Sequence, residues 1–189
     1  MTRILGTSSA LLVPVVFLFA GCSDGKSMGG APKLVFDTDV RTAYAPARAC
    51  RSPGEHSGLN AFSVWVSPGA LPDFDRLWED PPGIARLPDG AVVVKEVYSG
   101  AECKASEVER WVAMQKEKGF DPAHADWHWQ EVTAKGTVTT DGAATACINC
   151  HRGGDDGSCI GYGEEHGRDY TCTVADVAGA SPQGLDGGK

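Results

Sequence analysis

The chain has 189 residues, 42% of them hydrophobic, and a formal net charge of −8 at pH 7. Its length suits one domain with one core. The acidic balance argues against nucleic acid as a partner, because phosphate backbones are bound by Lys and Arg. It favours a cationic redox partner or a small neutral or cationic substrate, although an acidic surface also simply keeps proteins soluble.

Residues 1–21 have the pattern of an export signal. Arg3 supplies a short positive region, and an apolar run that is short for a membrane span follows from Ile4 to Ala20. Phe19 to Cys22 resembles a bacterial lipobox. It predicts cleavage before Cys22 and lipid attachment to that cysteine. Because Phe19 stands where Leu is usual, ordinary cleavage and an uncleaved anchor remain alternatives.

The rest of the chain divides by composition. Residues 22–33 are Gly-rich and predict a flexible tether, residues 34–175 predict the folded domain, and residues 176–189 predict a disordered Gly-rich tail. We therefore expect a protein of the cell envelope, lipid-anchored to a bacterial membrane and facing the periplasm or the exterior. The sequence leaves open which membrane holds the anchor.

Short strands broken by turns dominate the expected domain. Alternating apolar residues predict strands over 62–66, 91–98 and 126–133, and helical spacing predicts a short helix over 72–82. Residues 108–117 fit a helix and a strand equally well, because apolar side chains share a face in both. Residues 144–151 predict a helical turn.

The run from Cys147 to His151, Cys-Ile-Asn-Cys-His, carries the clearest chemical signal. Thiols three positions apart lie on one side of a helical turn, where each can add to a vinyl group of haem, and the next imidazole is delivered to the iron. The sequence thus predicts one covalent haem c, bound by Cys147 and Cys150 with His151 as iron ligand. The alternatives are a thioredoxin-like redox pair and half of a zinc site.

The remaining cysteines suggest an oxidising compartment. Cys159 and Cys172 both follow the haem motif, and a disulfide between them would close a Gly-rich loop. A bridge between Cys50 and Cys103 follows by elimination.

Several motifs together resemble the cytochrome P-460 family. They run in chain order over about residues 61–170: Leu87–Gly90, Val93–Glu96, Met114–Lys116, Gly119–Trp127 and Cys147–His151. The resemblance implies an α+β fold, an antiparallel β-sheet domain with a few short helices, commonly dimeric, around a five-coordinate haem with an open distal face. It implies a strand at residues 108–117. Members of the family oxidise hydroxylamine, and the related cytochrome c-prime-beta proteins bind nitric oxide.

The chain departs from the family pattern after the haem motif. An Asp-Tyr pair often follows that motif closely, whereas Asp169–Tyr170 lies well beyond His151. This spacing predicts an insertion at residues 152–168, which is most simply a disulfide-pinned surface loop. The lipid anchor is a second departure, since a soluble periplasmic enzyme would not need one.

Lys95 matches the family position whose side chain is cross-linked to the haem. Period-2 alternation puts Lys95 on the same strand face as Ala91, Val93 and Val97, so its ammonium would point toward an apolar side. The alternative is that the opposite face turns inward and Lys95 lies in solvent.

The resemblance implies an oxidoreductase that acts on hydroxylamine or nitric oxide and passes electrons to a separate redox partner. The alternatives are a cytochrome that only carries electrons or binds nitric oxide, and a structural lipoprotein with a vestigial motif. Candidate proton acceptors are Glu96, Glu131 and Asp141. Candidate sixth iron ligands are His56, His124, His128, His166 and Met114.

Overall fold

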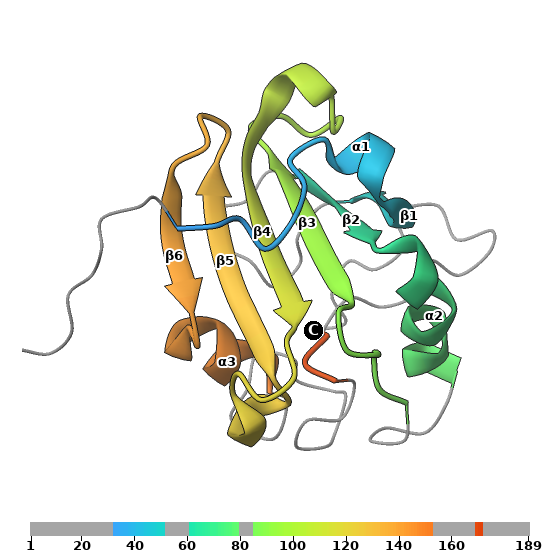
Figure 1. The fold of residues 1–189 in the computed structure, drawn as a ribbon. Coiled ribbons are helices and arrows are strands. Elements are labelled where there is room, and N and C mark those ends of the chain that lie inside the picture. The colour runs from blue at the N-terminus through green and yellow to red at the C-terminus, as the bar shows by residue number, and fades with distance from the viewer. Residues whose placement is uncertain (1–31, 52–60, 80–84, 153–168, 172–189) are drawn as a thin grey trace, which may run out of the picture. The chain divides into compact units, whose positions relative to one another are not determined.

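The computed structural model describes residues 32–51, 61–79, 85–152 and 169–171. Within them one antiparallel sheet of six strands follows chain order (Figure 1). The strands are β1 (Ala45–Arg51), β2 (Ala61–Val66), β3 (Val92–Tyr98), β4 (Val108–Lys116), β5 (Trp127–Thr133) and β6 (Val138–Gly142). The helices are α1 (Val40–Ala43), α2 (Leu71–Glu79) and α3 (Thr145–His151), with 3₁₀ turns η1 (Pro68–Ala70), η2 (Ala105–Glu107) and η3 (Pro122–His124).

The predicted α+β class with an antiparallel sheet and a few short helices is confirmed. Residues 108–116 form a strand because the sheet buries Ala113 on one face and Met114 on the other. The sequence analysis missed both edge strands and α1. The edge strand β1 carries Pro46 and has irregular pairing with β2, and β6 alternates no strongly apolar side chains.

Both faces of the sheet are covered. On one face, Val93, Met114 and Trp129 pack with Ile148 of α3 in a core that also contains Phe74 and Leu77 of α2. We call this the α3 face. A second cluster occupies the opposite face, where Phe36 and Val40 cover Val92, Val94, Ala113 and Val132.

The segment that precedes α1 covers the opposite face by crossing β6, β5 and β4 (Figure 1). Gln130 on β5, only 1% exposed, holds the segment through both ends of its side-chain amide. Its Oε1 accepts from the Val35 amide at 3.1 Å, and its Nε2 donates to the Lys33 carbonyl at 3.0 Å. The chain is thereby fixed to the sheet as soon as the predicted tether ends.

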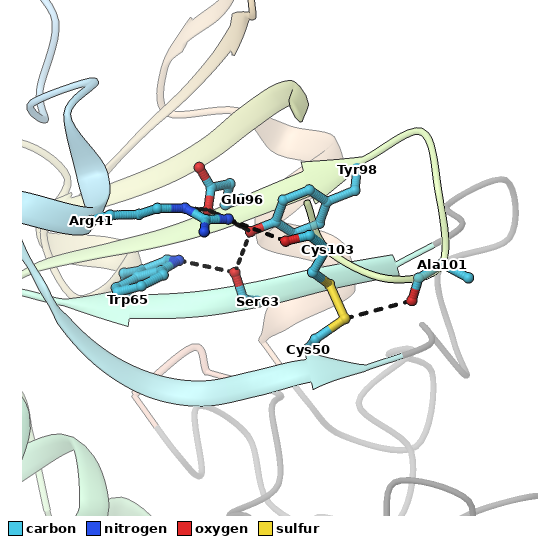
Figure 2. Close-up of a disulfide and its surroundings, with 8 residues drawn as sticks. All are labelled: Arg41, Cys50, Ser63, Trp65, Glu96, Tyr98, Ala101 and Cys103. Atoms are coloured by element: carbon cyan, nitrogen blue, oxygen red, sulfur yellow. Dashed lines mark hydrogen bonds and ion pairs between the residues drawn. A yellow bond between two sulfur atoms is a disulfide. The ribbon is translucent and has the colours of Figure 1, made fainter. Parts of the chain in front are cut away.

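A disulfide joins Cys50 on β1 to Cys103 in the connection between β3 and β4 (Figure 2). This bridge, predicted by elimination, is confirmed. The second predicted bridge, Cys159 with Cys172, lies outside the described residues.

A polar network lies beside the bridge on the opposite face (Figure 2). Arg41 of α1 donates to Glu96 Oε2 at 3.3 Å, to the Tyr98 hydroxyl at 2.9 Å and to the Cys103 carbonyl at 3.2 Å. Tyr98 also donates to Glu96 and shares a hydrogen bond of 2.8 Å with Ser63. Glu96 is 3% exposed, so its carboxylate is compensated by these partners.

The predicted export signal, the tether up to residue 31 and the predicted tail fall outside the described residues. Cys22 is therefore also outside them. None of the described helices is long and apolar enough to span a membrane.

Candidate haem-attachment site

Helix α3 presents the two motif thiols next to the sheet. Ile148, at 5% exposure, anchors the helix in the core of the α3 face. Cys147 packs against the same core, and both Cys147 and Cys150 are half-buried and form no disulfide. Because they are three positions apart on a helix, the two sulfurs lie on one side of it. Helix α3 therefore directs both thiols to one region.

His151 at the end of α3 has a defined tautomer. Its Nδ1 lies 3.0 Å from the backbone carbonyl oxygen of Tyr170. A carbonyl only accepts hydrogen bonds, so Nδ1 carries the proton and Nε2 has the lone pair. The ring also meets Trp129 edge-on, with centroids 5.0 Å apart. This is the state in which imidazole binds a metal through Nε2, with its orientation set by the other nitrogen.

The Tyr170 carbonyl is fixed by its neighbour Asp169, which is 0% exposed. Asp169 accepts from Lys116 Nζ at 2.6 Å and from the Leu87 amide at 2.8 Å, and its own carbonyl accepts from Trp127 Nε1 at 3.0 Å. Sequence analysis did not identify this role. It noted only that the Asp-Tyr pair is displaced along the chain, whereas the pair lies directly against His151.

Lys95 lies on the α3 face in the middle of β3. Its cross-strand partners are Val64 on β2 and Val112 on β4, and the strand alternation places it on the same face as Val93. The side chain is half-buried, with Nζ 4.7 Å from the centre of the Phe62 ring. Lys95 is therefore not fully in solvent, while the opposite face of β3 is buried as that alternative expected.

Burial lowers the pKa of Lys95 to about 8, and the two motif thiols oppose this shift. The pKa of Cys147 is raised by burial first, and then by Glu131 and Cys150. Each effect requires the groups to be near one another. Lys95, Glu131, Cys147 and Cys150 therefore share one electrostatic environment, although they come from β3, β5 and α3.

Only one of the three candidate proton acceptors lies on this face. Glu131 pairs across strands with Val112, in the same row as Lys95, and its Oε1 is 3.6 Å from Nε of Arg110. Glu96 belongs to the network with Arg41 on the opposite face. Asp141 also faces away, because its Oδ1 accepts from Gln130 Nε2 at 2.9 Å.

The fold also places the candidate sixth iron ligands in different parts of the domain. His128 lies on the opposite face, stacked on Phe120, with Nδ1 3.0 Å from Glu117 and Nε2 2.9 Å from Asp141. His124 is engaged by Asp121 through Nδ1 at 2.8 Å.

Met114 is buried in the core of the α3 face, as expected for a packing side chain. His56 and His166 lie outside the described residues.

Trp129 supplies a further donor that sequence reasoning missed. Its side chain is 2% exposed, and among the described residues its Nε1–H has no hydrogen-bond partner. A buried donor without an acceptor is costly, so it favours a bound group that offers one. Together with two cysteines outside disulfides and an imidazole in the ligating tautomer, this donor fits a haem attached to α3.

Comparison with known proteins adds no family assignment. No protein-family model matches the chain, and no curated protein sequence matches it significantly.

Proposed function

We propose that this chain is an exported, lipid-anchored c-type cytochrome with one covalent haem. Cys147 and Cys150 would hold the haem and His151 would bind its iron. The observation that carries the proposal is the hydrogen bond from His151 Nδ1 to the Tyr170 carbonyl, which presents Nε2 next to two cysteines that form no disulfide. A thioredoxin-like pair would not require this arrangement of the histidine, whereas a zinc site would use it as well.

The proposed activity is oxidation of hydroxylamine or a reaction of nitric oxide, in line with the motif resemblance. Haem would supply an iron that binds a small nitrogenous ligand and exchanges electrons with a separate redox partner. Among the three candidate proton acceptors, Glu131 is the one placed to take a proton, because it lies on the α3 face and acts electrostatically on Cys147. Its side chain is 37% exposed, which gives that proton a route to solvent.

Lys95 is proposed to form the cross-link to the haem that the family match implies. A pKa of about 8 gives a substantial fraction of neutral amine near physiological pH. Joining the amine nitrogen to a ring carbon releases one proton from each of them and two electrons overall. An oxidant of the peroxide class would take the two electrons. Tryptic peptides should then include a haem-bearing species that joins Lys95 to the Cys147–Cys150 peptide.

A second function is favoured if Lys95 stays unlinked. Its ammonium has a cation–π contact with Phe62 that gives it a stable place without any covalent bond. The protein would then bind nitric oxide or carry electrons without turnover. Two separate peptides, with an ordinary haem c mass on the thiol-bearing one, would identify this case.

The first experiment is an absorption spectrum of the purified, exported protein with a haem-stained denaturing gel. We expect a stained band at the position of the chain, lost in Cys147→Ser with Cys150→Ser and retained in Asn149→Ala, whose exposed side chain lies between them. His151→Ala should change the spectrum. A blank gel for the unaltered protein, expressed with a haem-attachment system, would refute the proposal.

The lipid anchor is tested separately. Cys22→Ser should remove the lipid and release most of the chain from membranes, because an acidic domain has little other affinity for them. Unchanged membrane fractionation after demonstrated signal cleavage would contradict the anchor and leave the haem assignment intact.

A further inference from the structure

The hydrogen bond at His151 depends on residues far away in the chain. Helix α3 ends at His151, and the acceptor for Nδ1 in this hydrogen bond lies outside the helix. The acceptor is a backbone carbonyl 19 positions later, at Tyr170. The position of this one carbonyl therefore decides the tautomer and the direction of the ring.

Tyr170 and Asp169 adopt a backbone conformation that ordinary residues avoid. Their φ angles are +62° and +50°, both in the left-handed region, and both side chains are buried. Residues in this region persist only where surrounding contacts hold them, and they cluster at functional sites. The strain needs a compensating anchor, and the contacts of Asp169 supply it.

The strongest of those contacts is an ion pair with Lys116. The two side chains are 8% and 0% exposed, and Lys116 Nζ lies 2.6 Å from Asp169 Oδ1. Lys116 is the last residue of β4, and its ammonium also sits 4.6 Å from the centre of the Trp127 ring. The anchor is thus attached to two rigid strands, β4 and β5.

We infer that Lys116 and Asp169 form a positioning pair, which holds the Tyr170 carbonyl against His151 and so fixes the axial imidazole. The inference rests on the proposed haem ligation by His151. Neither residue touches the reacting ligand. Their effect is on the proton at His151 Nδ1, which stays in place only while the carbonyl stays in place.

The test follows that proton directly in the haem-loaded protein. Proton NMR of protein labelled with ¹⁵N-histidine identifies the hyperfine-shifted Nδ1 resonance whether or not a sixth ligand is bound. Its exchange with D₂O measures opening of the hydrogen bond. Lys116→Met and Asp169→Asn should speed this exchange by about tenfold or more, because a lost charge-assisted hydrogen bond is worth at least that factor. Lys116→Arg should restore much of the protection.

Two controls separate positioning from general destabilisation. Glu96→Gln disrupts a buried ionic network on the opposite face, and Arg86→Gln removes an exposed side chain whose Nε lies 4.0 Å from the same Asp169 carboxylate. Both should leave the Nδ1 resonance and its exchange unchanged.

Unaltered exchange in Lys116→Met and Asp169→Asn would overturn the inference. An equal acceleration in Glu96→Gln would also overturn it. If Lys116→Met fails to fold, the Asp169→Asn comparison decides alone, because the amide retains an oxygen for the Leu87 amide. Absence of haem from the unaltered protein would instead refute the proposed function.

Discussion

Removing the Cys50–Cys103 disulfide should destabilise the domain by a calculable amount. The bridge closes a loop with a sequence separation of 53. The chain-entropy relation assigns a loop of that size about 4 kcal/mol at 25 °C, through the freedom that the unfolded chain regains. The sheet pairing of β1 with β2 does not depend on the bridge, so most native contacts should survive.

The assay is urea unfolding of the haem-free chain. It compares a double variant, which carries both Cys50→Ser and Cys103→Ser, with the unaltered protein. The free energy of unfolding should fall by about 4 kcal/mol. The denaturant slope should rise, because an unfolded chain without the bridge exposes more surface. Cys147→Ser, which alters a free thiol, is the matched control. A loss below about 1 kcal/mol with an unchanged slope would refute the assignment of this stability to loop closure.

Three further predictions concern the described sheet. In the haem-free chain, reaction of Lys95 with an amine reagent should be half-maximal near pH 8, because burial lowers its pKa to about 8 from 10.5. Since the folded state favours the neutral amine, stability should rise as pH increases from about 8 to 10.5, and Lys95→Met should abolish that rise. A labelling midpoint above pH 10 would contradict this. Gln130→Met should lower the free energy of unfolding by about 1–3 kcal/mol and increase amide exchange at Val35, because the part-buried Val35 amide and Lys33 carbonyl lose their partner. Unchanged exchange would show that the N-terminal segment is held by other contacts. Gly90→Ala should cost about 1–2 kcal/mol in thermal unfolding. The φ of Gly90 is +83° and an added Cβ meets nothing within 4 Å, so a neutral result would show that the turn relaxes without loss.

The apolar pattern predicted β2, β3 and β5, whereas it did not decide β4, for which the family resemblance implied a strand. The alternation around Lys95 gave its face correctly, and the helical alternative for residues 108–117 was overridden by pairing of β4 with β3 and β5. The two edge strands were harder to predict. β1 and β6 have few apolar positions, and their structure is decided by neighbouring strands rather than by local preference.

The residues of the candidate site also differ in how far the sequence alone could predict them. Cys147, Cys150 and His151 are adjacent in sequence, so their chemistry could be predicted without a fold. Asp169 could not, because its partners Lys116 and Leu87 are 53 and 82 positions away. The choice among Glu96, Glu131 and Asp141 likewise needed the register, which alone decides the face of each carboxylate.

The sequential strand order has a consequence for folding kinetics. Every strand pairs with its neighbour along the chain, so the pairings are local in sequence and the relative contact order is low for a sheet protein. Helix α3 follows the last strand, two residues after β6 ends. A chain that emerges N-terminus first can therefore assemble its strands before Cys147 and Cys150 appear. Chemistry at these thiols would then meet a sheet that is already formed, with the Asp169–Tyr170 segment still to dock.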